Sequence, residues 1–282
     1  MRVLPIPALL WLTGCLGQIL DAPFVLASGL GAARGVAPSP DRTLLVATAD
    51  GVVEVGGDGT ASTLVEGVDA RAVATHRTRI YVLVEEGILH GSSSGAAEAF
   101  RLWPRSGIRD IQASCDEQLL YADDVGVWTW DPGSGQSARR GPPLANITSL
   151  ALDPIHPCDG VLALATDAVH WVSKDAVVPI ITGLRRPVAL TADRWGGIWV
   201  VHDEPPVLAK LTAEGPETRA RHVDATADLV FGVGELLHPA NVYFVGPSGS
   251  LDYARVVLEG ERLRASRPTG TPPRLGAPSP HR

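Results

Sequence analysis

Short apolar runs recur along the chain at nearly constant intervals. Each run is rich in Val, Ile, Tyr and Trp, while Gly, Pro, Asp and Ser separate one run from the next. The six runs that open a new unit are centred 37 to 41 residues apart, on Val36, Val73, Ile111, Leu150, Val188 and Leu229. No stretch keeps a helical period over three turns. The pattern therefore predicts strands and turns arranged in six sequence repeats.

Each repeat contains further apolar runs after the first. The second runs are Leu44–Ala47, Ile80–Val84, Leu119–Ala122, Val161–Ala165, Ile198–Val201 and Val242–Val245. The third runs are Gly51–Val55, Gly87–His90, Gly126–Trp130, Ala168–Val172, Val207–Leu211 and Leu251–Val257. Fourth runs are weaker, as at Ala61–Val65 and Val177–Thr182. Four antiparallel strands in a unit of about 40 residues are typical of a propeller blade, so we predict an all-β fold, a six-bladed β-propeller.

A β-sandwich or a two-domain β protein ranks lower, because neither has a fixed four-strand register. Two segments compete to close the predicted ring. Pro23–Leu30 resembles the fourth strand that precedes each new repeat, and Glu261–Ala265 could instead be the outer strand of the sixth blade. We favour closure by the N-terminal segment. The propeller is then expected over residues 23–266, followed by a disordered Pro-rich tail over 267–282.

The N-terminus has the pattern of an export signal. One positive residue precedes a short apolar run that is too short to span a bilayer, and Leu12-Thr13-Gly14-Cys15 resembles the bacterial lipobox. The resemblance implies a signal peptide over residues 1–14, cleavage, acylation of Cys15 with palmitate as one chain, and a tether over 15–22. The alternatives are an ordinary signal peptide with a chance cysteine, or a short buried helix. Because Leu16 is not the Asp that resembles an inner-membrane retention signal, we favour the outer membrane within the bacterial cell envelope.

Composition excludes two classes of protein. The 282 residues are 45% hydrophobic and 20% charged, which is too much apolar material for a disordered chain. The net charge of -7 argues against a nucleic-acid partner, because binding phosphates requires clustered positive charge.

The fifth repeat carries a family resemblance. Pro187–Val200 resembles the Pro-x-Gly-x-x-x-Asp-x-x-Gly-x-Leu-Trp-Val pattern of six-bladed propellers in the superfamily of gluconolactonase/SMP-30, NHL-repeat and strictosidine-synthase-like proteins, and Arg34–Asp41 is similar to it. In the lactonase branch the resemblance implies a divalent metal held by Glu, Asn and Asp. Those positions fall on Arg34, Thr148 and Val188, and Asn146 lies two residues from the Asn position. We therefore expect no metal, no cofactor and no catalytic residue of the lactonase type.

Arginines precede the first run in four repeats. Arg34, Arg71, Arg109 and Arg186 are expected at one end of the ring, near its axis, where they could hold an anionic ligand. The links after the second runs carry many acidic residues toward the same end, so neighbouring blades could instead pair these charges.

Two cysteines remain beyond Cys15. Cys115 and Cys158 both fall in the turn between first and second runs, in adjacent repeats, so a disulfide is expected in an oxidising compartment. The alternative is two free thiols that lie too far apart.

These expectations lead to a function. We expect a lipid-anchored, exported β-propeller that acts as a binding or scaffold protein, attached to the membrane through Cys15, with an unknown protein or small-molecule ligand at the channel mouth. The alternative is an envelope hydrolase, lactonase or esterase-like, of the SMP-30 or strictosidine-synthase type. It is disfavoured because the metal-ligand positions hold Arg34, Thr148 and Val188.

Overall fold

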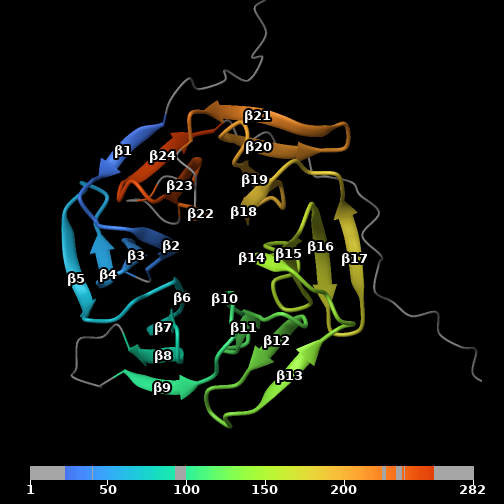
Figure 1. Ribbon diagram of the computed structural model, residues 1–282, viewed down its shortest axis with the longest axis horizontal. Helices are drawn as coiled ribbons and strands as arrows, with labels where there is room; N and C mark the ends of the chain where they lie inside the picture. Colours follow the sequence, from blue (N-terminus) through green and yellow to red (C-terminus); the bar gives the residue numbers. More distant parts are fainter. Residues whose placement is uncertain are drawn as a thin grey trace, which may run out of the picture.

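The chain folds into a ring of six β-sheets around a central axis (Figure 1). The computed structural model describes residues 23–39, 41–92, 100–223, 227–232, 237 and 239–256, and these form 24 strands and no helix. Each sheet has four antiparallel strands, so the predicted six-bladed β-propeller is confirmed. No segment within those ranges forms a helix that could cross a membrane.

The strands occupy four concentric positions in the ring. The innermost strands are β2 (Ala33–Pro38), β6 (Ala72–His76), β10 (Asp110–Ala113), β14 (Ile147–Leu152), β18 (Pro187–Ala192) and β22 (Asp228–Phe231). The second strands are β3 (Leu44–Thr48), β7 (Arg79–Val84), β11 (Leu119–Ala122), β15 (Gly160–Ala165), β19 (Ile198–His202) and β23 (Asn241–Val245). The third strands are β4 (Gly51–Val55), β8 (Gly87–Ser92), β12 (Val127–Trp130), β16 (Ala168–Ser173), β20 (Val207–Thr212) and β24 (Leu251–Arg255). The outer strands are β5 (Ala61–Glu66), β9 (Arg101–Pro104), β13 (Ser137–Arg140), β17 (Val177–Ile181), β21 (Gly215–Arg221) and β1 (Phe24–Ala27).

The core lies between the blades. In one of these hydrophobic layers Tyr81 and Ile88 of the second blade pack with Ile111, Leu119 and Trp130 of the third. In each blade the second strand lies between two such layers, which cover both of its faces. Every residue of the second strands β3, β11 and β15 is therefore buried. The ring therefore consists of interlocking blades with no single central core.

The N-terminal strand closes the ring, as expected. β1 pairs antiparallel with β24, opposing Phe24 to Tyr253 and Val25 to Asp252, and the Phe24 and Tyr253 rings stack with centroids 5.3 Å apart. The competing segment, Glu261–Ala265, lies outside the described residues. The predicted signal peptide, Cys15, the tether and the Pro-rich tail also lie outside them and stay predictions.

A disulfide joins the third and fourth blades. Cys115 follows β10 and Cys158 precedes β15, and their Cα atoms are 5.5 Å apart. The bond connects two turns on the far side of the ring from the arginines, which lie at the starts of the innermost strands.

Candidate functional site

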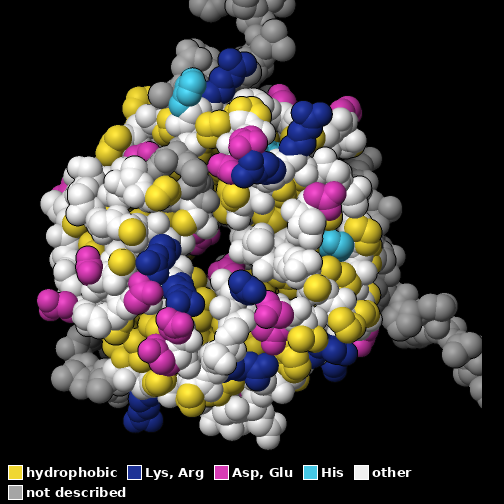
Figure 2. Space-filling view, viewed as in Figure 1, with side chains coloured by type: hydrophobic (Ala, Val, Ile, Leu, Met, Phe, Trp, Pro, Cys, Tyr) yellow, Lys and Arg dark blue, Asp and Glu magenta, His cyan; other side chains and the backbone are white. Residues whose placement is uncertain are grey.

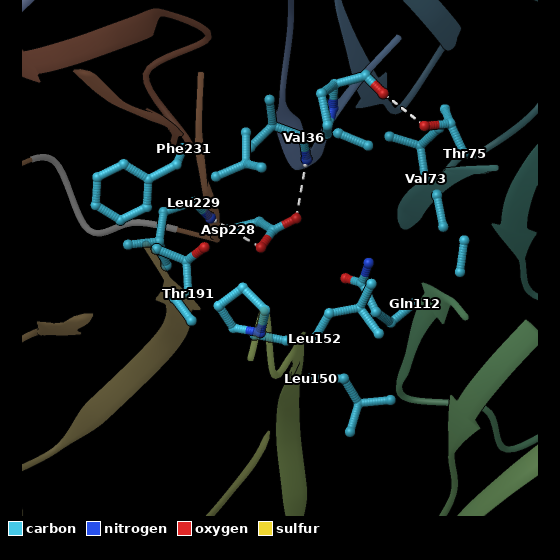
Figure 3. A pocket seen from close by; sticks show the side chains of 18 of the residues that line it. Val36, Val73, Thr75, Gln112, Leu150, Leu152, Thr191, Asp228, Leu229 and Phe231 are labelled. Carbon is cyan, nitrogen blue, oxygen red and sulfur yellow. Dashed lines mark hydrogen bonds between the residues drawn. The ribbon is translucent and has the colours of Figure 1, made fainter. Parts of the chain in front are cut away.

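A pocket of 540 Å³ occupies the axis of the ring. Residues from the innermost strands of all six blades line it, and Figure 2 shows that the molecule is hollowed at this point, with acidic side chains beside the opening. The walls are mainly apolar, because the innermost strands turn Val36, Val73, Leu150 and Leu229 toward the axis (Figure 3). A concave, largely apolar cavity with a few polar groups is the usual form of a small-molecule site.

Asp228 is the first residue of β22, and its carboxylate faces the cavity (Figure 3). Its Oδ1 accepts the backbone N–H of Leu229 at 2.8 Å, and its Oδ2 accepts that of Val36 in the first blade at 2.9 Å. The second hydrogen bond links the last blade to the first. Asp228 is therefore held in place by two elements of the ring.

Asp110 has the same role on the opposite side of the ring, as the first residue of β10. Its Oδ1 accepts the backbone N–H of Ile111 at 2.7 Å, and its Oδ2 accepts that of Leu150 in the next blade at 2.6 Å. Asp110 and Asp228 thus stand three blades apart, at one repeat position, and both line the axial pocket.

The two carboxyl groups titrate far above the usual range of an aspartate. Burial raises the pKa of Asp228 to about 7. Burial, and then the negative charge of Asp228, raise the pKa of Asp110 well above its ordinary value. Because the groups interact, their protons are lost in steps that belong to the pair. The pocket therefore contains two carboxyl groups that burial favours in the protonated form more than in an exposed aspartate.

Polar side chains complete the pocket. Gln112 lies two residues after Asp110 on β10, hence on the same face of the strand, and its side chain lines the cavity (Figure 3). Thr191 of β18 is buried and also lines the cavity, whereas the hydroxyl of Thr75 donates a hydrogen bond to the carbonyl oxygen of Pro38. An amide and a hydroxyl are thus available beside the carboxyl pair.

The four arginines predicted at the mouth are paired with carboxylates. The ion pairs are Arg34–Asp69 (2.6 Å), Arg71–Glu85 (3.0 Å), Arg109–Asp124 (2.8 Å), Arg186–Asp203 (3.0 Å) and Arg186–Glu204. Each of the four arginine side chains is at least 38% exposed. Three of the four arginines pair within their own blade, so the charges are balanced locally. None of the four lines the axial pocket, and an anion site at these arginines stays a prediction.

The positions of the lactonase metal ligands do not fit a metal ion. Arg34 is a cation paired with Asp69, Thr148 donates its hydroxyl to the carbonyl oxygen of Leu164 at 3.4 Å, and Val188 packs against the hydrophobic core. Within the described ranges no three His, Cys, Asp or Glu side chains come together as metal ligands. A hard divalent cation requires several oxygen ligands, which these positions lack.

Sequence reasoning did not nominate Asp110 and Asp228 as site residues. The signal was present in the repeat alignment, because the position before the central residue of the first run holds Gly35, Ala72, Ser149 and Pro187 in the other repeats. Two acidic residues three repeats apart, at a position otherwise occupied by small residues or proline, lie on opposite sides of a closed ring of six. The hypothesis could have been made once six repeats were counted.

Comparisons with known proteins identify similar structures and no family by sequence. No family model matches the chain, and no curated protein matches it. Its structure is similar to a gluconolactonase from Xanthomonas campestris (TM-score 0.69, 12% identity, 83% of this chain and 89% of that one). It is similar to a calcium-binding regucalcin from Agrobacterium tumefaciens (TM-score 0.66, 12% identity, 83% and 93% coverage). A putative glucose dehydrogenase from Thermus thermophilus is also similar (TM-score 0.62, 14% identity, 84% and 99% coverage).

These findings correct the expected function. A binding or scaffold protein was the main expectation, but the similar structures are a gluconolactonase, a regucalcin and a putative dehydrogenase, which favours the alternative, a hydrolase of the lactonase or esterase type. The family's metal positions lack ligands in this chain, but they are one source of catalysis among several. The chain has ionisable groups elsewhere, in the walls of its axial pocket.

Proposed function

We propose that this protein is a hydrolase of the lactonase or esterase type and that its active site is the axial pocket. The observation that carries the proposal is the pair of carboxyl groups, Asp110 and Asp228, in the walls of a 540 Å³ cavity at the ring's axis. The fold is shared with a gluconolactonase, which makes hydrolysis of a cyclic ester the natural first reaction to test.

Hydrolysis of an ester makes two demands that this pocket can meet. A base must take a proton from water as its oxygen attacks the carbonyl carbon, and an acid must give a proton to the departing oxygen. Groups whose pKa values are raised into the neutral range can serve both purposes at pH 7. The cavity has the size of a small-molecule site.

We also propose where the protein works. The lipobox-like segment ending at Cys15 favours an exported protein anchored to a bacterial membrane by its acylated N-terminus. A disulfide between Cys115 and Cys158 supports an oxidising compartment outside the cytoplasm, because such bonds rarely persist inside it.

The test of the activity is direct. The purified chain is given a panel of γ- and δ-lactones, including gluconolactone, and simple aryl esters, and acid release is followed by pH titration. We expect saturable hydrolysis of at least one substrate class. In Gln112→Trp a bulky ring fills the pocket, so hydrolysis should fall at least about 100-fold, since a lost near-attack geometry alone costs that much.

Arg139→Trp is the matched control, because Arg139 is exposed on the outer strand of the same blade and does not line the pocket. It should keep the activity of the native chain. If no substrate of the panel is hydrolysed, the proposal is wrong; if Gln112→Trp keeps full activity, the axial pocket is not the active site.

A further inference from the structure

We propose that Asp110 and Asp228 carry out the hydrolysis directly as a base and acid pair, without a metal ion, on neutral esters or lactones with an apolar body. This inference rests on the proposed function and assigns its chemistry to two residues of this chain. It departs from the metal-dependent arrangement that the family resemblance implies.

The carboxyl groups of Asp110 and Asp228 are held in fixed positions in the wall of the cavity. Each carboxylate has about four acceptor sites, and backbone N–H groups of the described residues use two of them in each case, so the remaining sites can accept hydrogen bonds from water or substrate. Both side chains are partly accessible from the cavity although protein surrounds them. Because every backbone donor belongs to a strand, the two groups are held rigidly while their remaining lone pairs are available.

The charged groups around Asp110 and Asp228 leave the two carboxyl groups without an ion-pair partner among the described residues. In the part of the chain that the structure describes, neither carboxyl group forms an ion pair, so no cation neutralises them. The ionisable groups on or next to the strands packed around them are Arg34, Arg71, Tyr121, Arg186, Arg194, Tyr243 and His76, of which Arg194 and His76 also line the pocket. Arg34, Arg71 and Arg186 have their own carboxylate partners, and Arg194 lies over the ring of Trp195 at 4.0 Å.

The reaction balances with water as the only co-reactant. The ionised carboxylate removes a proton from water while the water oxygen forms a bond to the carbonyl carbon. The protonated carboxyl group then gives its proton to the ring or alkoxy oxygen as the carbon–oxygen bond breaks. The products are a carboxylic acid and an alcohol, and the pair again holds one proton, now on the other residue, until exchange with solvent restores the starting state.

Gln112 has a place in the same step. Its side chain lies on the face of β10 that carries Asp110 and projects into the cavity (Figure 3). An amide N–H there can donate to the carbonyl oxygen as negative charge develops on it, which is the role of an oxyanion-binding group.

The walls select the substrate class. Val73, Leu150, Leu229 and Phe231 are buried side chains that border the cavity, so an apolar substrate body replaces water there favourably. A substrate anion would face the negative charge of the carboxyl pair, while the guanidinium of Arg194, which also lines the pocket, lies over the ring of Trp195. Neutral, apolar lactones and esters are therefore favoured over polyhydroxylated or anionic ones.

The experiment compares Asp110→Asn and Asp228→Asn with the native chain on the best lactone or ester found. Each variant should lose 10²- to 10⁴-fold in kcat, the usual contribution of a positioned acid or base. The native pH profile should be bell-shaped, with its rising limb at about 7 as Asp228 ionises, and the limb should shift in Asp110→Asn. Activity should be unchanged by chelators and by added Ca²⁺.

Ser149→Ala is the matched control. Ser149 occupies the same repeat position in the fourth blade, and its Oγ accepts the backbone N–H of Leu190 in the next blade at 3.3 Å, but it cannot act as an acid. It should keep activity within about threefold. A His76→Gln variant should leave the rising limb of the pH profile in place, because that limb belongs to the aspartates.

A measurement that needs no substrate accompanies these assays. The infrared spectrum of the native protein at pH 6.5 should contain the band of a protonated carboxyl group, which should change in both Asn variants and not in Ser149→Ala. Absence of that band overturns the pair. Retained activity in either Asn variant, or activity that requires a divalent cation, also overturns the pair while leaving the hydrolase itself standing. No hydrolysis by the native chain would overturn both.

Discussion

At the scale of single residues, the two axial aspartates have a structural role beside the chemical role that we propose for them. Asp228 and Asp110 each receive a backbone N–H from the neighbouring blade, so they help to join the ring. Ser149 makes the same kind of contact to Leu190 without a charge. The contact alone therefore does not require a carboxylate, and the acidic residues at two positions call for a further explanation.

The pair also affects stability, with a sign opposite to that of most aspartates. A raised pKa means that the folded chain keeps a proton that the unfolded chain has lost above about pH 4. The stabilising effect is thus complete below pH 4 and is lost as the pH rises through about 7. The melting temperature should fall between pH 5 and pH 8 by more in the native chain than in Asp110→Asn.

Between pH 5 and pH 8 the melting temperature of the native chain should fall by at least about 3 °C more than that of Asp110→Asn. One unit of pKa shift corresponds to about 1.4 kcal/mol, and each kcal/mol corresponds to about 2–4 °C in a domain of this size. Scanning calorimetry at the two pH values measures it, and Ser149→Ala should show the native slope. Equal slopes in the native chain and Asp110→Asn would show that folding does not raise the pKa of Asp110.

At the scale of elements, the buried strands could be predicted from the sequence and the exposed outer strands could not. The runs Leu119–Ala122 and Gly51–Val55 coincide with β11 and β4, because strands between two blades must be apolar. The outer strands β9 and β13 were not predicted, since β13 exposes three of its four residues and Ser137–Arg140 carries no apolar pattern. An outer strand such as β13 is held in place by backbone hydrogen bonds to the third strand of its blade, here β12. The pattern of apolar and polar side chains does not reveal such backbone hydrogen bonds.

The repeats could nominate the axial pair, but they could not show that its two members face one another. Repeats establish which residues share a position in each blade, but the facing of Asp110 and Asp228 depends on closure of the ring. The metal positions could be judged from sequence alone, because Arg34 and Val188 lack the chemistry of a ligand in any geometry.

The closing strand gives a prediction at this scale. A chain that begins at Gly29 lacks β1 and leaves the edge of β24 unpaired. Three residue pairs are lost, and at about 1 kcal/mol for each hydrogen bond the melting temperature should fall by roughly 6–12 °C. A chain that begins at Ala22 keeps β1 and serves as the control.

If both truncated chains melt together, β1 does not contribute to closure. If the chain that begins at Gly29 instead forms dimers through the free edge of β24, the strand still has the predicted role, because an unpaired edge seeks a partner.

At the scale of the whole molecule, the proposed anchoring to a membrane can be tested directly. Cells that produce the full chain should incorporate labelled palmitate into it, and Cys15→Ala should abolish the label because that residue provides the acylated sulfur. Cys115→Ser is the control, since that cysteine lies in the disulfide. Label that persists in Cys15→Ala would contradict lipid anchoring.

Closure by β1 has a mechanical consequence for an anchored protein. The residues that would lead from Cys15 to the fold enter it at the seam between the last blade and the first, where Phe24 stacks on Tyr253 and Asp228 holds Val36. A force that acts on this N-terminal segment is therefore applied first to the seam between the last blade and the first, and only then to another blade. If the protein is anchored as proposed, tension from the membrane would act on the part of the ring that contains the hydrogen bond between Asp228 and Val36, so the proposed anchor and the proposed reaction site would be mechanically linked.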